Sequence, residues 1–414
     1  MAAPLTMARA NSALKVLFPQ KRIEQMDWEN MAFYNWVTKK TDFYGRSMEL
    51  PVMVGPHGGA SNQFANAQAM KGAGTYVHFL LTRKKKYIMT SFDNEAIEAA
   101  ERDVGGYMDL KELEIESALR GIKQQTAADM QGNGSGRIGT VSAVNTSTNV
   151  ITVGEADIVH FQLGQRLNSF SSNTFGATKT SAGPKGYMVV GAVDPDNNQI
   201  TLDVAAGDTI LQDGCDATTD KYLAIDGSVG NALFGTQAWV PIDRSTLATP
   251  FANVTRSQFT SRLGGIYYDG SATGSVAEAL ERAIARGNKE GSSPDVAWVN
   301  FNRFQDISID LGARAVREPY KIGTFAYSSI KFATGKKDIT VVADPNFADN
   351  DCLIAAKNSW QFRTLKGAPR ILGRQGNSEM LLEPAADGWE VRQGWYGEMT
   401  CDRPIDNIRV VLPT

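Results

Sequence analysis

The sequence of 414 residues predicts an α+β protein that carries a small inserted β-barrel or β-sandwich. Three observations indicate this class. A helical pattern over residues 107–131 is long enough to cross a small domain. Residues 137–230 are poor in Lys and Arg and show patterns of strand, turn and strand. After Trp239, two helix patterns are followed by a series of strands, which is the order expected of an α+β domain.

The long helix predicted over residues 107–131 has two non-polar faces. One face includes Ile115 and Ile122, and the face nearly opposite ends in the small residues Gly121 and Ala128. A helix with two such faces usually has another element packed on each of them. On this segment alone, the central helix of an ordinary α/β domain is the better interpretation.

The composition describes a globular protein and excludes several classes. Hydrophobic residues make up 42% of the chain, charged residues 21%, and the net charge is −3. A domain that grips nucleic-acid phosphates is normally basic, so this class is not favoured. No apolar run reaches the ~18–20 residues of a membrane span, and the first residues lack the apolar core of a signal peptide. The cysteines are scattered, which predicts a reducing compartment without a disulfide framework and no export by the general secretory route; they are Cys215, Cys352 and Cys401.

The N-terminal arm, residues 1–44, is unusually aromatic. Its aromatic side chains are interleaved with charged and amide residues, and no single helical stripe accounts for all of them. Such side chains need a surface to lie on, which is either the body of the same chain or a neighbouring subunit. Both alternatives stay open, and the candidates for contact between subunits in this arm are Trp28, Phe33, Tyr34 and Trp36.

Residues 45–92 predict an extended loop built as a long β-hairpin. One arm covers residues 48–54 and the other runs from 76 to 89, with a tip rich in Gly, Ala, Asn and Gln that we expect to be flexible. A two-stranded ribbon is marginal alone in water and needs support from a sheet, a helix or another subunit. A basic run on the second arm is expected to be a solvated face or a charge partner across a subunit boundary rather than a phosphate site. It supplies the further contact candidates Arg83, Lys84, Lys85 and Lys86.

Residues 137–230 contain an internal repeat. The pattern of residues 141–153 recurs at 190–202, with Asn149 and Asn198 at the same place in the turn of each copy. Each copy predicts a β-hairpin, and two hairpins with further strands nearby predict a small barrel or sandwich. Glycine-rich segments flank this region, so we interpret it as a domain inserted where the host chain lies on the surface.

The sequence therefore divides into five parts. They are the N-terminal arm (1–44), the extended loop (45–92), the long helix with its flanks (93–136), the inserted β-domain (137–230) and the remainder (231–414). The remainder is predicted to contain two helices and an antiparallel-looking sheet. The helices cover residues 275–286 and 302–311, and the strands cover 296–299, 328–332, 339–343, 352–356, 360–364, 389–401 and 408–412.

Motifs that carry chemistry do not occur in the sequence. The histidines are isolated and lack the spacing of metal ligands; they are His57, His78 and His160. Residues 194–198 begin like a calcium loop, but Gln199 and Ala205 stand where a Gly and a bidentate Glu are needed, so a turn is predicted. Nucleophile motifs and phosphate-binding loops are missing as well. The sequence predicts no catalytic, cofactor-binding or metal-binding residues, and no enzyme.

The order of these parts resembles the major capsid proteins of tailed bacteriophages, which have the HK-ninety-seven-type shell fold. NMAFYNWVTKKTDFYGRSMELPVMVG is similar to the N-terminal arm that leads into the family's extended loop, and FLLTRKKKYIMTSFDNEAIEAA to the end of that loop. Residues 107–131 match the spine helix, and GWEVRQGWYGEMTCDRPIDNIRVVLP resembles the closing strands of the peripheral and axial domains. The resemblance covers residues 10–135 and 240–414, and residues 137–230 would be the insertion domain that many members carry.

The resemblance implies a structural protein that assembles into pentamers and hexamers of an icosahedral shell around double-stranded DNA, without sequence-specific DNA binding. It also implies a portal, room for a decoration protein and, because about 40 residues precede the ribbon, a separate scaffolding protein. The expected location is the virion capsid, assembled in the cytoplasm of the host bacterium, with no membrane and no cofactor. Some relatives cross-link their subunits through a lysine of the extended loop, but Lys71 near the tip lacks matched partners and is not assigned this role.

Two other functions fit parts of the sequence. A protein nanocompartment that encloses cargo enzymes has the same fold, but such shells usually lack so large an inserted β-domain. A carbohydrate- or surface-binding β-module on an enzyme is supported only by the repeat. Residues 137–230 contain no Trp, whereas sugar-binding modules normally display exposed aromatic side chains.

Overall fold

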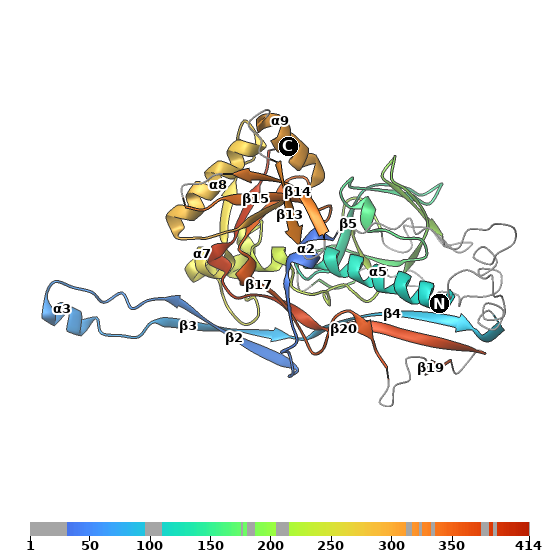
Figure 1. Cartoon of the computed structure of the whole chain (residues 1–414), viewed down its shortest axis with the longest axis horizontal. Coiled ribbons are helices and arrows are strands. Elements are labelled where there is room, and N and C mark those ends of the chain that lie inside the picture. Colours follow the sequence, from blue (N-terminus) through green and yellow to red (C-terminus); the bar gives the residue numbers. More distant parts are fainter. Residues whose placement is uncertain are drawn as a thin grey trace.

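In the computed structural model, a two-stranded ribbon, a β-barrel and a long helix surround one body (Figure 1). The ribbon of β2 (Ser47–Gly55) and β3 (Thr75–Thr82) projects from one side, and a β-barrel lies on the other. The helix α5 (Leu110–Gln131) lies along the strands β4 (Lys84–Asp93) and β20 (Gly388–Cys401). The residues described are 31–95, 110–174, 177–179, 187–203, 215–311, 317–322, 325–332, 336–373, 381–383 and 387–413.

A mixed sheet of seven strands forms the centre of the body, and both of its faces are buried. In β12 (Val296–Val299), Val296 and Trp298 belong to one apolar cluster, while Ala297 and Val299 belong to another on the opposite face. Burial on both faces explains why this strand reads as a continuous apolar run. In order across the sheet the strands are β11 (Ile266–Asp269), β21 (Ile408–Val411), β16 (Asp351–Ala355), β12, β15 (Ile339–Ala343), β14 (Phe325–Phe332) and β13 (Arg317–Ile322).

Two helices, α8 (Val276–Glu290) and α9 (Phe301–Leu311), pack on one face of this sheet, as their apolar stripes predict. The first of them starts where Ser275 caps it, because the Ser275 hydroxyl accepts a hydrogen bond from the main-chain N–H of Glu278. It ends at Gly291, which adopts the left-handed φ of 89° that favours glycine at a helix end.

The prediction of one antiparallel sheet in the C-terminal part is wrong in two respects. The pairs β11–β21 and β12–β15 run parallel. In addition, β17 (Trp360–Thr364) and β20 leave this sheet and form a second one with β4. Apolar periodicity indicates that a strand is buried but not which strand it pairs with, so the error lies in the pairing. The second sheet also contains β1 (Thr38–Lys40), β18 (Arg370–Ile371) and β19 (Leu381–Leu382).

The predicted hairpin exists but is shorter than expected. Its second arm ends at Thr82, and the strand that follows, β4, pairs with β20 from Lys84 to Asp93 instead of continuing the ribbon. The tip, which the composition predicts to be flexible, contains the short helix α3 (Phe64–Ala69). The ribbon is therefore a separate two-stranded element that projects from the body (Figure 1).

The described strands of residues 137–230 form a closed barrel, not a sandwich. The internal repeat is confirmed, because Asn149 and Asn198 both adopt φ of 55° in equivalent turns. The two hairpins also bond reciprocally: the N–H of Val153 donates to the carbonyl of Asn198 at 2.9 Å, and that of Leu202 donates to the carbonyl of Asn149 at 2.8 Å. Around the barrel the strands are β10 (Tyr222–Ile225), β5 (Arg137–Asn145), β6 (Val150–Val153), β9 (Gln199–Asp203), β8 (Met188–Asp194) and β7 (Arg166–Phe170).

Short elements complete the described chain. None of the helices in the described ranges combines the length and the apolar character needed to cross a membrane. All three cysteines are buried. The short helices are α2 (Ala32–Trp36), η1 (Ile158–His160), α6 (Thr236–Trp239), η2 (Arg244–Ala248), η3 (Ser257–Phe259), α7 (Thr260–Gly264), η5 (Lys357–Ser359) and η6 (Pro404–Asp406).

Candidate assembly surfaces

The described part of the aromatic arm, residues 31–44, packs against its own chain. Phe33, Tyr34 and Trp36 lie in α2 and are each at most 2% exposed. The rings of Phe33 and Trp36 both pack edge-on against Trp298, with centroids 5.4 Å apart in each pair. The main-chain N–H of Phe33 donates to the Asp344 carboxylate at 2.8 Å. The helix α2 thus fills the core on the sheet face opposite α8 and α9.

The structure therefore supports packing on the same chain for these three aromatic residues. Their role in contacts between subunits stays a prediction, and Trp28 lies outside the described residues. Within the described part of the arm, residues 31–44, the exposed aromatic side chain is that of Tyr44, which is 77% exposed and was not among the candidates.

The basic run alternates between the two faces of its strand. Lys86 forms an ion pair with Asp129 of α5 at 2.6 Å, and both side chains are at most 11% exposed. The Lys84 ammonium donates to the carbonyl of Gly230 at 3.3 Å. Lys85 points the other way and is exposed. Two of the predicted contact residues, Lys84 and Lys86, thus bind partners within their own chain.

The remaining basic candidate, Arg83, is half-buried at the base of the ribbon. Its guanidinium Nη1 donates to the carbonyl of Phe43 at 3.5 Å, and its main-chain N–H donates to the carbonyl of Arg46 at 3.1 Å. Among the four, Lys85 is the residue whose exposure fits a contact with a neighbouring subunit, and that role stays a prediction.

A fully buried carboxyl group lies next to these lysines. Glu398 of β20 accepts hydrogen bonds at Oε1 from the main-chain N–H groups of Phe234 (2.7 Å) and Met399 (3.0 Å). Burial raises the pKa of Glu398 from 4.5 to about 8, and these hydrogen bonds and the charge of Lys84 offset burial only in part. The nearby Asp129 raises the pKa further. The Glu398 side chain is therefore mainly protonated at neutral pH.

The raised pKa predicts a specific pH dependence of stability. Between pH 4.5 and about 8 the folded protein binds more protons at Glu398 than the unfolded chain does, so the free energy of unfolding falls as the pH rises through this window. The slope from this one group approaches about 1.4 kcal/mol per pH unit. Glu398→Gln keeps a neutral acceptor and should remove this slope, so that the variant is more stable than the wild type above pH 8.

Urea unfolding of the purified chain between pH 5 and pH 9 measures this effect. Glu281→Gln, at an exposed position of α8, is the matched control and should follow the wild type at every pH. Parallel pH profiles for Glu398→Gln and the wild type would contradict the assignment.

The tip of the ribbon exposes large apolar side chains. No residue from 56 to 76 is buried, and the exposed fractions reach 82% for Phe64, 62% for Tyr76 and 54% for Met53. The composition of the tip drew attention to its small and amide residues, so these side chains were not among the candidates. Apolar side chains gathered on a projecting element are typical of a surface that is covered in an assembly.

The base of the ribbon, in contrast, is anchored in the body. Phe79 is fully buried, and its ring packs against those of Trp239 (5.2 Å between centroids) and Phe251 (6.2 Å). The guanidinium of Arg262 donates to the carbonyl of Val54 at 2.7 Å. The ribbon therefore leaves the body in a fixed direction and presents its apolar tip away from it (Figure 1).

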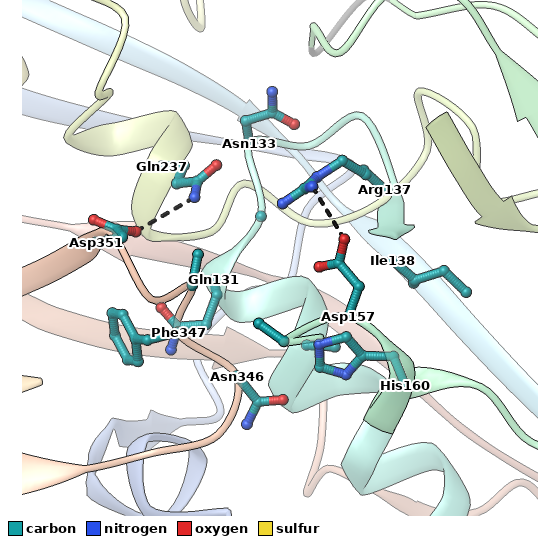
Figure 2. A pocket seen from close by; sticks show the side chains of 14 residues that line it. Gln131, Asn133, Arg137, Ile138, Asp157, His160, Gln237, Asn346, Phe347 and Asp351 are labelled. Carbon is teal, nitrogen blue, oxygen red and sulfur yellow. Dashed lines mark hydrogen bonds and ion pairs between the residues drawn. The ribbon is translucent and has the colours of Figure 1, made fainter. Parts of the chain in front are cut away.

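A buried polar network joins the end of α5 to the central sheet. Arg409 of β21 forms an ion pair with Asp351 of β16, and both side chains are at most 1% exposed. The Arg409 guanidinium also donates to the Thr236 hydroxyl at 2.9 Å, and that hydroxyl donates to the side-chain carbonyl of Gln131 at 2.9 Å. Figure 2 shows Asp351 and Gln131 beside a small polar pocket, where Gln237 donates to Asp351 at 3.5 Å. The network holds the end of α5 against β16 and β21. Among the residues described, its side chains do not form a constellation typical of catalysis.

The structure is similar to solved capsid structures over almost its whole length. A chain of the cyanophage A-1(L) capsid asymmetric unit superimposes with a TM-score of 0.54 and 10% identity over 99% of each chain. The capsid protein of the native GTA particle gives 0.47 and 8% over 100% of each chain. The SrpI encapsulin complex from Synechococcus elongatus gives 0.47 and 6% over 99% of this chain and 95% of that chain. In sequence, the chain matches no family model and no curated protein.

The likeness to the cyanophage protein shows the fold. The chain has the α+β shell fold of tailed-phage capsid proteins, as the resemblance in sequence predicted.

Proposed function

We propose that this chain is a major capsid protein, a structural and non-catalytic subunit that assembles with copies of itself into pentamers and hexamers of an icosahedral shell. The observation that carries the proposal is the ribbon. It is fixed at its base by Phe79 and Arg262 and exposes Phe64 and Tyr76 at its tip. A second copy of the chain that covers this tip would remove apolar area from water, which stabilises the assembly by roughly 25 cal/mol per Å².

The proposed contents and partners follow from the same role. Double-stranded DNA would be enclosed without sequence-specific binding, and the net charge of −3 suits a container that does not hold phosphates tightly. A portal, a separate scaffolding protein and a decoration protein are proposed partners. The proposed location is the virion, after assembly in the cytoplasm of the host bacterium.

Negative-stain electron microscopy of the purified chain, alone and with a candidate scaffolding protein, tests the proposal. Closed shells, or rings of five and six subunits, are the expected result. A uniform monomer under every condition would contradict it and would favour the β-module. Closed shells filled with protein cargo instead of DNA, isolated from the native host, would favour the nanocompartment.

We also propose that residues 137–230 form an inserted domain within the division 1–44, 45–92, 93–136, 137–230 and 231–414. The chain enters the barrel after Ser135 and leaves it before Gly230. These two segments lie side by side, because the N–H of Gly230 donates to the carbonyl of Ser135 at 2.8 Å. A side chain at Gly136 would come within 2.4 Å of the Ser228 carbonyl, so this close approach requires glycine. The barrel has an apolar cluster of its own, built around Ile151, Ile200 and other buried side chains.

An inserted domain of this kind should fold alone. Residues 137–230 expressed in isolation are expected to unfold cooperatively in urea, because the barrel is closed and leaves no edge strand that needs a partner. Circular dichroism and tyrosine fluorescence measure the transition, since residues 137–230 contain no Trp. A gradual loss of signal without a sigmoidal transition would contradict the independent domain.

A further inference from the structure

The strand β4 forms an open edge of the second sheet. Among the described residues it pairs with β20 alone, along its whole length. The carbonyl oxygen of Lys86 points toward β20, because a Cβ built at Gly394 would meet it. Main-chain groups alternate in direction along an antiparallel strand, so those of residues 85, 87, 89 and 91 point away from β20. These outward groups have no hydrogen-bond partner in the described part of the chain.

The side chains of the same residues lie on the face of the sheet that α5 does not cover. Lys86 points toward α5, where it pairs with Asp129. Successive side chains point to opposite faces, so Tyr87 and Met89 point away from α5, and they are 45% and 61% exposed. An open strand edge beside an exposed apolar face is typical of a site where another chain adds a strand.

The ribbon is poorly suited to supply that strand. The N–H of Leu80 in β3 donates to the carbonyl of Ala252 at 2.9 Å, so this edge of the ribbon faces the body. Glu49 lies opposite Leu80 and directs its main-chain groups to the other edge, as does Pro51, which has no N–H to donate. Proline on an outer edge hinders pairing with a further strand. With ten residues and no proline, β4 is longer than either strand of the ribbon.

The charges along β4 indicate a partner of the same kind. Its beginning is basic, with Lys85 exposed, and its end is acidic, with Asp93 followed by the exposed Glu95. Asp387 adds to the acidic end, because its main-chain carbonyl accepts a hydrogen bond from Asn94 at 3.2 Å. A second β4 in antiparallel orientation brings opposite charges together at both ends, whereas a parallel one would oppose like charges, which is destabilising.

We propose that two copies of the chain pair their β4 strands antiparallel, across a two-fold axis beside Met89. In this register Lys85 of each copy lies opposite Asp93 of the other. Tyr87 lies opposite Ser91, and the two Met89 side chains lie opposite each other. The outward main-chain groups of both strands then bond, and the two sheets join into one. The inference rests on the proposed function, because the second copy would be a neighbouring subunit of the shell.

Disulfide formation tests the register. The Cα atoms of a hydrogen-bonded antiparallel pair lie about 5.5 Å apart, which a disulfide can span. Met89→Cys should therefore give a cross-linked dimer on a non-reducing gel after mild oxidation. Glu281→Cys, at an exposed position of α8, is the matched control and should stay uncross-linked. A Met89→Cys chain that cross-links no more than this control would overturn the proposal.

Charge exchange tests whether the partner is a second β4. Lys85→Glu and Asp93→Lys, each combined with Met89→Cys, place like charges opposite one another at both ends of the pair. Each variant alone should lose the cross-link, and a mixture of the two should restore it, because their charges complement each other. Their thermal unfolding midpoints report whether each chain is folded. A cross-link that neither charge variant weakens, or a loss that mixing does not reverse, would contradict the pairing.

Two further readouts separate the alternatives. If the ribbon of a neighbour covers β4 instead, Met89→Cys should cross-link to Tyr76→Cys in a mixture and not to itself, which would overturn the pairing. Electron microscopy of the same samples separates this inference from the proposed function. Closed shells of Met89→Cys without the cross-link would refute the pairing and leave the capsid role in place, whereas a chain that neither cross-links nor assembles would contradict both.

Discussion

Deletion of residues 58–72 is expected to give a folded subunit that no longer forms closed shells. These residues make up most of the ribbon tip, and none of them is buried, so the core keeps its packing without them. The strands β2 and β3 stay paired from Ser47 to Gly55, and the ring contacts of Phe79 at the base are unaffected. Subunits would therefore remain soluble with an unchanged unfolding midpoint and lose the apolar surface that we propose a neighbour covers.

A single substitution gives a graded form of this test. Burial of a side chain such as Phe64 contributes about 1.5–3 kcal/mol per contact, so Phe64→Ser should raise the critical concentration for assembly at least about tenfold. Light scattering across a concentration series measures it. Leu163→Ser is the control, because Leu163 is 70% exposed but lies in the barrel, away from the ribbon. Shells of normal size at the wild-type critical concentration, from either ribbon variant, would refute a role of the tip in assembly.

Several elements of residues 231–414 could be predicted well from the sequence. The strands 296–299, 339–343 and 360–364 have the predicted bounds, and α8 and α9 were both expected. The physical reason is that continuous apolar runs and strong helical stripes each have one stable environment, a strand buried on both faces or a helix packed on a sheet. The repeat in the barrel was equally clear, because a turn that needs a left-handed residue places Asn149 and Asn198 alike.

The pairing of strands that lie far apart in the sequence could not be predicted. The assignment of β4 to the ribbon failed because its pairing with β20 joins segments about 300 residues apart, and alternation along a strand says nothing of its neighbour. The same limit applies to the candidate contact residues. Aromatic side chains such as Phe33 were selected because exposure to water costs free energy, and the same cost is removed when they bury in their own chain. In the sequence, Phe64 is surrounded by amide and small residues, which gave no sign that its side chain is exposed. The structure shows the exposure because the ribbon projects from the body.

Replacement of Arg409 by Met is expected to lower the free energy of unfolding by about 3–5 kcal/mol at neutral pH, because it leaves the buried Asp351 carboxylate without its counter-charge. It also removes the donor to the Thr236 hydroxyl. Burial raises the pKa of Asp351, and the charge of Arg409 counteracts this rise. Without Arg409 the pKa should rise further, so the folded variant binds a proton that the unfolded chain does not, and its deficit should shrink as the pH falls. Urea unfolding of the unassembled subunit at pH 7 and pH 5 measures both effects.

A second substitution separates loss of the pair from loss of packing. Asp351→Asn combined with Arg409→Met removes both charges, so the double variant should recover part of the stability lost in Arg409→Met, and its deficit should not depend on pH. Arg282→Met is the control for an exposed pair, because Arg282 and Glu278 lie 2.5 Å apart with side chains 60% and 41% exposed. This substitution should lower the free energy of unfolding by less than about 1 kcal/mol. If Arg409→Met costs no more than Arg282→Met, the network from Asp351 to Gln131 does not hold α5 on the sheet, and the apolar cluster around Ile122 and Met130 must do so alone.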